Sequence, residues 1–398
     1  MNMQGFKETD TKKYNFPKVG IGLIGYGFMG KAHTNAYKKL SFFSWPPVAI
    51  PELVAVCGLL ENEAQTQEAA YRYGYKGYYN DWNLLIKDPR INLIDNCTPD
   101  DVHCEPCIAA VEAGKHIMCE KPLAMTVADA KRMYDAARKA KVKHMLGHNY
   151  RFIPAVRLAR EMIQNGVIGK IYEFRGRYLQ SVGAGPENLI EDVWYASGTQ
   201  SGINLGIGCH IIDLARFLVS EIKTVSGIQK TFNSSRLNKN NNSESIKADE
   251  TNFSIVEFEN GAVGSIESSG ISAGRLNQHT WEINGSNGSI YWDLEDLNHL
   301  YVWLKNTAAN AVSGFTKVSV TDPKNPFASL SWPPGHNIGW ENGHINEIAH
   351  LLDCIVNNKS IEPYGATFYD GYIIQLIMDR IRESSERGKK LEINPGEV

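Results

Sequence analysis

Residues 20–30 read Gly-Ile-Gly-Leu-Ile-Gly-Tyr-Gly-Phe-Met-Gly. This stretch places Gly25, Gly27 and Gly30 in the spacing Gly-x-Gly-x-x-Gly, directly after an apolar run typical of a buried parallel strand. The first glycine permits a tight strand-to-helix turn, the second lets the backbone approach a pyrophosphate, and the third allows close helix packing. The N-terminus of the helix that follows offers amide N–H groups to phosphates. We therefore expect a dinucleotide site, with an ordinary glycine turn as the alternative.

Length and charge narrow the class of protein. A chain of 398 residues is too long for one ordinary core, so two domains are expected. The net charge of -3 gives no electrostatic reason to bind nucleic acid or a membrane surface, and no apolar stretch is long enough to span a bilayer. Residues 1–18 are polar and lack the apolar core of a signal peptide. We expect a cytoplasmic protein whose first residues form a flexible tail or an arm between subunits.

Seven scattered cysteines fit reduced thiols better than a disulfide framework. Cys104 and Cys107, preceded by His103, have the spacing of a metal or redox site, but no second pair accompanies them. Pro106 suits the first turn of a helix. We interpret this stretch as a helix start and expect no metal.

Apolar runs alternate with amphipathic stretches from residue 19 to residue 147, which predicts βαβ units and a parallel sheet. Strands are expected at 19–24, 53–57, 91–96, 117–119 and 144–147. Helices are expected from residue 82 and over 127–141, the latter capped by Thr126.

Beyond residue 150 the pattern becomes that of a half-exposed antiparallel sheet. Strands are expected at 171–179, 253–258, 262–268, 278–284 and 288–294, with helices within 335–358 and over 369–387. Residues 232–247 are rich in Asn and Ser and predict a mobile surface loop.

Lys121 lies where a predicted parallel strand ends, in Cys119-Glu120-Lys121-Pro122. The carboxyl ends of such strands face the ligand crevice of an open α/β sheet. Burial there, beside a cationic nicotinamide, predicts a lowered pKa and proton exchange with a substrate hydroxyl near neutral pH. A surface lysine in an ordinary turn is an equal alternative.

Five segments together resemble the glucose–fructose oxidoreductase/inositol dehydrogenase (Gfo/Idh/MocA) family: residues 22–33, 97–103, 113–124, 147–155 and 208–218. The resemblance runs in order over most of the chain. It implies an α/β Rossmann domain plus an α+β domain with a large open, mostly antiparallel sheet. The expected boundaries are a flexible tail at 1–17, the NAD(P)-binding domain at 18–147, the substrate and oligomerisation domain at 148–368, and a C-terminal helix and tail at 369–398 packing back on the first domain.

The resemblance also implies roles for individual residues. Gly25, Tyr26, Gly27, Phe28, Met29 and Gly30 would hold the pyrophosphate, Thr98, Pro99 and His103 would lie beside the nicotinamide ribose, and Glu120, Lys121 and Asn149 would lie where cofactor meets substrate. Lys121 would be the acid/base group, and His210 would bond the reacting hydroxyl or relay its proton. The cleft would be lined by Asn149, Tyr150, Arg151 and Trp194.

One departure from the family pattern lies at position 206. The family usually carries an acidic residue four positions before the active-site histidine, where this chain has Gly206. Glycine can neither accept a proton nor orient an imidazole. Asn204 lies nearby but is not a base, and Asp213 could orient His210 or serve only in helix packing.

A second departure lies after the second strand. An acidic residue for the ribose of NAD, or an arginine for the phosphate of NADP, is expected there, and Gly58 is neither. Glu61 could reach the ribose or could simply be a charge at a helix N-terminus. NAD is favoured over NADP because the turn has no basic residue.

Three functions therefore stay open. The first is an NAD(P)-dependent oxidoreductase acting on a hydroxyl of a sugar, polyol or glycoside, with the 3-position of a glucoside as one target. The second is an enzyme that cleaves glycosides by transient oxidation and elimination, and the third is a non-catalytic nucleotide sensor; Gly206 motivates both. The flat face of an open sheet predicts a homo-oligomer, commonly a dimer or tetramer in the family.

Overall fold

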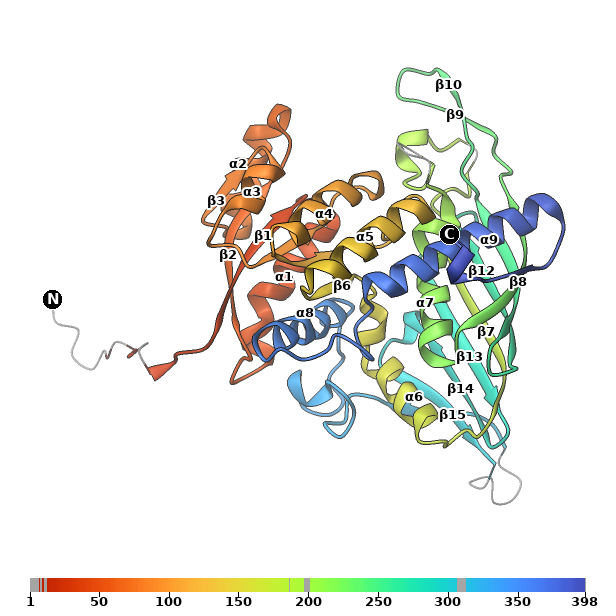
Figure 1. Ribbon diagram of the computed structural model, residues 1–398. Coiled ribbons are helices and arrows are strands. Elements are labelled where there is room, and N and C mark those ends of the chain that lie inside the picture. The colour runs from red at the N-terminus through yellow and green to blue at the C-terminus, as the bar shows by residue number, and fades with distance from the viewer. Residues whose placement is uncertain are drawn as a thin grey trace.

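Two sheets organise the chain in the computed structural model, which describes residues 7, 9–10, 13–185, 187–196, 201–305 and 313–397 (Figure 1). The first is a six-stranded parallel sheet in the order β3-β2-β1-β4-β5-β6. Its strands are β1 (Lys18–Ile24), β2 (Ile50–Cys57), β3 (Gly77–Tyr79), β4 (Leu93–Asn96), β5 (His116–Cys119) and β6 (His144–Leu146). The strand order reverses between β1 and β4, and in such sheets the ligand crevice lies at this point, outside the carboxyl ends of the strands.

Five helices connect the parallel strands: α1 (Phe28–Phe43), α2 (Glu63–Tyr73), α3 (Trp82–Lys87), α4 (Cys104–Glu112) and α5 (Val127–Ala140). The Thr126 side chain caps α5 by accepting from the Asp129 N–H, as predicted. Cys104 and Cys107 lie in the first turn of α4, which confirms the interpretation of that segment as a helix start.

The second sheet has nine strands in the order β16-β15-β14-β13-β7-β12-β11-β8-β17. They are β7 (Ile171–Leu179), β8 (Ile222–Lys230), β11 (Thr251–Phe258), β12 (Val263–Ser269), β13 (Gln278–Gly285), β14 (Gly288–Asp293), β15 (His299–Leu304), β16 (Thr316–Ser319) and β17 (Leu391–Glu392). The pair β7 and β12 is parallel and the other pairs are antiparallel, so the predicted open, mostly antiparallel sheet is confirmed.

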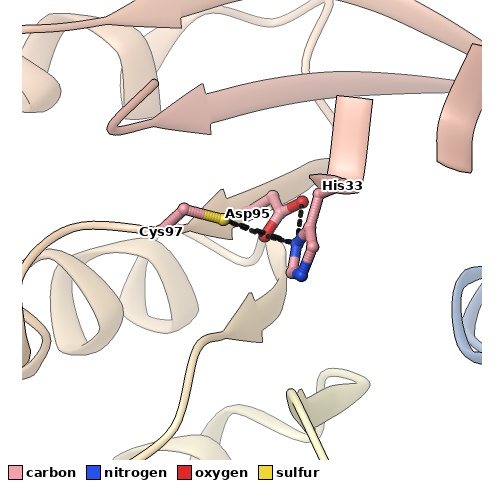
Figure 2. A group of neighbouring side chains, drawn as sticks. All are labelled: His33, Asp95 and Cys97. Carbon is pink, nitrogen blue, oxygen red and sulfur yellow. Dashed lines mark hydrogen bonds and ion pairs between the residues drawn. The ribbon is translucent and has the colours of Figure 1, made fainter. Parts of the chain in front are cut away.

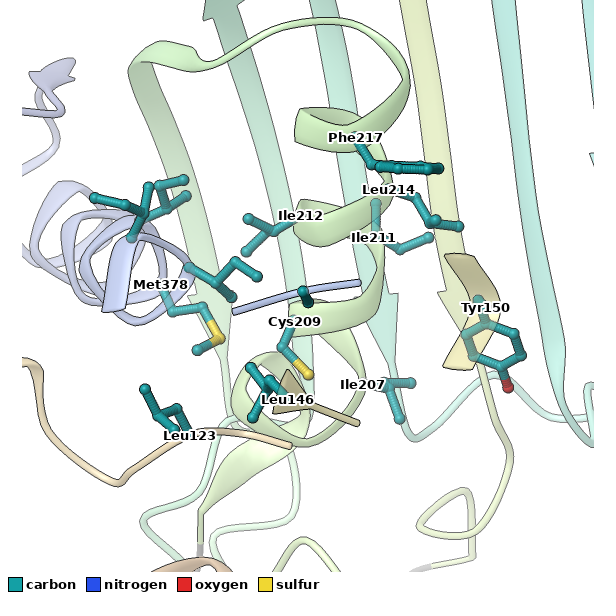
Figure 3. Packing of buried hydrophobic residues seen from close by; sticks show 14 of the residues in the cluster. Leu123, Leu146, Tyr150, Ile207, Cys209, Ile211, Ile212, Leu214, Phe217 and Met378 are labelled. Carbon is teal, nitrogen blue, oxygen red and sulfur yellow. The ribbon is translucent and has the colours of Figure 1, made fainter. Parts of the chain in front are cut away.

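Helices α6 (Pro154–Gln164), α7 (Cys209–Leu218) and α9 (Phe368–Arg387) pack on one face of this sheet. Every residue of α7 is buried, because the helix lies between the sheet, α9 and the first domain. Figure 3 shows this packing, with Leu123 and Leu146 contributed by the first domain and Met378 by α9. A helix held on all sides gives His210, in its first turn, a fixed position.

Helix α8 (Glu341–Val356) packs against α1 and the Rossmann sheet. Ile345, Ile348 and Leu351 of α8 belong to the same core cluster as Val19 and Ile21 of β1. The chain thus returns to the first domain before residue 368. The domain boundaries themselves remain predictions.

Two segments differ from expectation. Residues 232–247 carry a two-stranded ribbon, β9 (Ser235–Leu237) and β10 (Ser243–Ser245), rather than a structureless loop. Its Arg236 is buried, pairs with Glu250 at 3.1 Å and donates to the Gly183 carbonyl at 2.7 Å, since a buried cation needs such partners.

The predicted tail 1–17 falls partly outside the described residues. Its last part is packed, because the rings of Tyr14 and Phe16 contact Trp45 at centroid distances of 5.8 and 5.4 Å.

No helix of the described residues has the length and apolar character that crossing a membrane requires.

Candidate active site

A cleft of about 600 Å³ lies at the reversal point of the parallel sheet and extends onto the second sheet. Eight of the residues expected at the site line it: Phe28, Met29, Glu120, Lys121, Asn149, Tyr150, Trp194 and His210. They come from the glycine turn, the segments that follow β5 and β6, α7 and, for Trp194, the segment between β7 and α7. The fold therefore brings candidate site residues of the two domains together in one cleft.

The glycine turn fits a pyrophosphate. Gly25 has φ 85°, and a Cβ there would lie 2.6 Å from the Cys97 carbonyl oxygen, while a Cβ on Gly30 would collide with the Gly25 carbonyl. Gly27 has no protein atom within 4 Å of where its Cβ would be. Protein packing explains the first and third glycines but leaves space beside the second, as a bound phosphate requires.

Two aromatic residues flank this turn differently. Phe28 is 71% exposed and stacks on Trp340 at 5.7 Å, at the mouth of the cleft. Tyr26 instead braces the turn from behind: its carbonyl accepts from the Tyr73 hydroxyl at 3.1 Å and its hydroxyl from Thr66 at 3.3 Å.

The residues expected beside the nicotinamide ribose form a braced loop. Thr98 donates through Oγ1 to Asn96 Oδ1 at 2.7 Å. His103 is fully buried, with its ring nitrogens 2.8 Å from the Pro122 carbonyl and 3.0 Å from the Thr98 carbonyl. His103 thus holds the segment Thr98–Pro99 against the one that carries Lys121, rather than facing the cleft.

Lys121 donates from Nζ to the carbonyl oxygen of Gly206 at 3.0 Å. Gly206 lies in a π-helical turn, Asn204–Gly208, that leads directly into α7. Such turns widen a helix locally and are frequent at functional sites. His210 follows one turn later and lines the same cleft as Lys121, whereas the convergence of the two groups on one hydroxyl stays a prediction.

The protonation states of these two groups differ. Burial lowers the pKa of Lys121, but the negative charges of its neighbours outweigh burial and raise that pKa above its usual value. Cys209 contributes only when ionised, and burial raises the pKa of that thiol to about 12, so the carboxylates of Glu120 and Asp100 act at neutral pH. The prediction of a lowered lysine pKa is wrong for the chain without cofactor, because it overlooked these acids.

His210 is neutral at physiological pH. Burial, followed by the positive charge of Lys121, holds its pKa well below the usual value. Its ring contacts those of Tyr150 at 4.9 Å and His148 at 5.4 Å, and its Nδ1 is buried without a hydrogen-bond partner.

Three residues expected at the substrate lie outside the lining of the cleft. Arg151 and Asp213 form a buried bidentate ion pair, with guanidinium–carboxylate distances of 2.6, 2.9 and 3.1 Å. Asp370 of α9 joins them at 3.3 Å. Asp213 therefore serves in helix packing, one of the two roles considered for it. The expectation that Arg151 binds the substrate is contradicted, because its guanidinium is bound to Asp213.

Asn204, the third of these residues, is buried in the π-helical turn, where its N–H donates to Asp249 at 2.9 Å. Its side-chain oxygen lies against Gly208, away from the cleft lining.

The space that an acidic side chain would take at position 206 is filled by Trp194. A Cβ on Gly206 would collide with the far edge of this indole, whose Nε1 donates to Gln180 at 3.3 Å. An aspartate at position 206 therefore requires the indole to move.

We predict that Gly206→Asp lowers the free energy of unfolding by about 1–3 kcal/mol, as overpacking usually does. The cost should largely disappear in a Trp194→Ala background, which a urea-denaturation double-mutant cycle measures. Equal costs in both backgrounds would show that the indole is not the obstacle.

A polar wall of the cleft escaped the sequence analysis. The Tyr150 and Tyr178 hydroxyls lie 2.9 Å apart, Tyr178 donates to Asn277 at 2.8 Å, and Gln180 donates to the same oxygen at 2.9 Å. The alternating pattern of β7 could have identified Tyr178 as a residue on the buried face of the sheet. Asn277 and Trp340 lie in connecting segments, where no sequence pattern indicates which residues face the cleft.

The segment after β2, where the adenosine ribose is expected, contains Gly58 and Glu61. A Cβ on Gly58 would collide with Thr66, so packing explains this glycine. Glu61 is exposed in the short helix η2 (Leu60–Asn62) that follows β2. Both alternatives for Glu61 remain.

His33, Asp95 and Cys97 place three potential metal donors within 4.8 Å of one another (Figure 2). These donors are buried or nearly so, and their polar atoms are directed at each other: His33 Nδ1 lies 3.0 Å from both Asp95 oxygens and 3.4 Å from the Cys97 sulfur. We interpret the group as a buried ion pair, and the absence of a metal stays a prediction.

Comparison with known proteins identifies the family. Residues 19–148 match the model described as "Oxidoreductase family, NAD-binding Rossmann fold", and residues 160–393 match its C-terminal alpha/beta domain. The chain belongs to the Gfo/Idh/MocA oxidoreductase family. The resemblance drawn from sequence motifs, and with it the NAD-binding Rossmann domain of an oxidoreductase, is confirmed.

Individual relatives cover nearly the whole chain. Levoglucosan dehydrogenase of Pseudarthrobacter phenanthrenivorans is 37% identical over 389 residues, 94% of this chain and 98% of the relative. D-glucoside 3-dehydrogenase of Escherichia coli is 30% identical over 86% of this chain and 90% of its own length. A solved structure of levoglucosan dehydrogenase with NADH and levoglucosan superposes with a TM-score of 0.90 at 37% identity, covering 95% of this chain and 100% of that one.

Proposed function

We propose that this chain is an NAD-dependent dehydrogenase that moves a hydride between nicotinamide and a hydroxyl carbon of a sugar or glycoside. The observation that carries the proposal is the meeting of Lys121 and His210 in one cleft beside the glycine turn. Relatives named levoglucosan dehydrogenase and D-glucoside 3-dehydrogenase support this substrate class. A ring hydroxyl such as the 3-hydroxyl, whose oxidation gives a stable ketone, is the proposed reacting group.

The walls of the cleft suit a sugar. Trp194 and Trp340 offer flat apolar surfaces to the C–H face of a pyranose ring. Asn149, Gln180 and Asn277 offer amide donors and acceptors for ring hydroxyls. Together they would hold one carbon in line for transfer, which is where much of the rate enhancement in such reactions arises.

Bound NAD supplies hydride acceptance and donation at its nicotinamide ring. Gly25, Gly27 and Gly30 would hold its pyrophosphate, with Phe28, Met29 and Glu120 nearby. The exposed Glu61 and the lack of a basic residue in the turn after β2 favour NAD over NADP.

Lys121 is the proposed proton carrier. As an ammonium it donates a proton to the oxygen of a forming alcohol, and as a neutral amine it accepts the proton of an alcohol being oxidised. His210, which is neutral and lines the cleft, accepts or donates a hydrogen bond with the same oxygen through a ring nitrogen.

This assignment predicts opposite pH dependences for the two directions. Because the pKa of Lys121 is raised, its ammonium persists above neutral pH, and reduction of a keto-sugar should stay constant from pH 6 to 8. Oxidation needs the neutral amine, so its kcat/KM should rise about tenfold per pH unit in the alkaline range. Steady-state rates in both directions test this, and an oxidation rate that is independent of pH would contradict the role of Lys121.

The two other functions are less well supported. Elimination would release the aglycone without net NADH, whereas a dehydrogenase accumulates NADH with a purified sugar. A sensor would bind NAD and turn nothing over. The retained Lys121 and His210, and the dehydrogenase names of the relatives, favour the first function.

A cytoplasmic location and a homo-oligomer, dimer or tetramer, belong to the same proposal. The sheet face away from the helices exposes neighbouring apolar residues: Phe253 is paired with Ile228 across β11 and β8, and Ile255 lies two residues further along. We predict that sedimentation equilibrium gives a dimer or larger and that Phe253→Lys with Ile255→Lys gives a monomer. A wild-type monomer at micromolar concentration would contradict the prediction.

A further inference from the structure

A chain of buried charged side chains runs behind the cleft. Glu120 Oε1 lies 2.9 Å from His33 Nε2, and His33 Nδ1 lies 3.0 Å from both oxygens of Asp95. Figure 2 shows His33 of α1 directed at Asp95 of β4. Tyr37 completes the chain by donating to Asp95 at 2.9 Å. Side chains of His33 and Asp95 have no exposed surface.

This geometry determines the charge of His33. Nδ1 of His33 makes the hydrogen bonds to Asp95, and Nε2 lies at ion-pair distance from Glu120 Oε1 without the geometry of a hydrogen bond. Two carboxylates, one beside each ring nitrogen, attract the imidazolium and not the neutral ring. Burial alone would lower the pKa of His33, but the charge of Asp95 outweighs burial and raises that pKa well above its usual value. The imidazolium, with a carboxylate on each side, is the state that avoids unpaired buried charge.

Glu120 connects this pair to the cleft. Its Oε2 accepts a hydrogen bond from the backbone N–H of Lys121 at 3.2 Å, and both residues line the cleft. Burial raises the pKa of Glu120, but the adjacent His33, followed by the charge of Lys121, outweighs burial and lowers that pKa to about 2. A buried carboxylate beside Lys121 is thus kept ionised by a histidine on its far side.

We propose that His33 is a positioning residue of the reaction: its imidazolium keeps Glu120 ionised and, through Glu120, stabilises the ammonium form of Lys121. The inference rests on the proposed function for its kinetic consequence, but the charge of His33 does not. The role would adjust the pH range in which the chain oxidises or reduces its substrate.

Other groups face the chain without replacing His33. From α8, the ring of His344 lies 5.3 Å from that of His33, and burial lowers the pKa of His344 to about 3, so it is neutral. Glu347 on the same helix is fully buried, and burial raises its pKa well above the usual value.

The other titratable groups fall into two sets: those around His33 and Asp95, and those around Lys121. Burial raises the pKa values of Tyr37, Tyr75 and Cys97, which leaves all three neutral. Lys121 is faced by Glu120, Asp100, Cys209, Tyr150 and His210.

The test compares His33→Asn with the wild type. Without the imidazolium, we expect the pKa of Glu120 to rise, so that Lys121 loses part of the negative charge that stabilises its ammonium form. The rising limb of kcat/KM for sugar oxidation should therefore move to lower pH by roughly one to three units, the usual effect of losing an adjacent opposite charge. His350→Asn is the matched control, because this imidazole is also largely buried on α8 but bonds the Ile361 carbonyl instead.

Glu120→Gln separates this role from a merely structural one. If His33 acts through Glu120, this variant shows the same shift, and the double variant His33→Asn, Glu120→Gln shows no further one. Additive shifts, an unmoved limb or a limb that moves to higher pH would overturn the proposal.

Nuclear magnetic resonance gives readouts without substrate. At pH 8 the wild type should show a histidine signal with both ring nitrogens protonated that is missing in His33→Asn; a neutral His33 would overturn the proposal. Lysine labelled with ¹³C at Cε, assigned with Lys121→Met, reports the Lys121 titration directly, which should move to lower pH in His33→Asn. If no sugar is turned over, the proposed function fails, and these two spectra still decide the role of His33.

Discussion

Replacing Lys121 with methionine should lower kcat/KM for the sugar by about 10²–10⁴-fold, the usual contribution of a positioned acid or base. Methionine keeps an unbranched chain of similar length and removes only the ammonium, which otherwise bonds the Gly206 carbonyl and lies in the cleft with His210. Steady-state kinetics in both directions measure the loss.

Two comparisons make this result specific. Binding of NADH, followed by its fluorescence, should change less than tenfold, because the glycine turn is untouched. Lys131→Met, which removes a lysine of α5 paired with Asp135 on the surface, should leave the kinetics unchanged. Near-normal turnover by Lys121→Met would remove this residue from the reaction.

Replacing Asp213 with alanine should lower the free energy of unfolding by about 3 kcal/mol, in the range seen when one partner of a buried ion pair is removed. The variant leaves the Arg151 guanidinium, which is 4% exposed, with only the longer contact to Asp370. Urea denaturation followed by tryptophan fluorescence gives the value.

The kinetics of the same variant separate structure from chemistry. Because Asp213 lies outside the lining of the cleft, kcat/KM of the folded enzyme at 25 °C should fall less than tenfold. Asp135→Ala, which breaks an exposed pair, is the control and should cost under about 1 kcal/mol. A stable Asp213→Ala protein that has lost activity would restore the catalytic alternative for this carboxylate.

Much of the fold followed from local patterns. The glycine spacing after β1, the period-two alternation of β7 and the Thr126 cap of α5 are each determined by neighbours in sequence. Family membership, inferred from motifs spread over the chain, located the cleft correctly through Lys121 and His210.

What the sequence could not reveal depends on contacts between distant segments. The raised pKa of Lys121 arises from Glu120 and Asp100, and Glu120 is itself in contact with His33 of the distant helix α1. The family resemblance of its segment placed Arg151 in the cleft with Asn149 and Tyr150, yet a tight turn directs it to Asp213, 62 positions away.

The π-helical turn and the place of Trp194 are also tertiary features. No pattern announces the turn, whose Gly206 carbonyl binds Lys121, or the indole that occupies the space of the usual acid. A glycine at position 206 suggested lost function from sequence alone, whereas the structure gives its backbone a role in holding the lysine.

The most direct test of the central claim is a crystal structure of the chain with NADH and the sugar it turns over fastest. The account predicts that one ring hydroxyl lies within 3.2 Å of both Lys121 Nζ and a ring nitrogen of His210, with its carbon facing the nicotinamide. A sugar bound with every hydroxyl more than 5 Å from either group would contradict it.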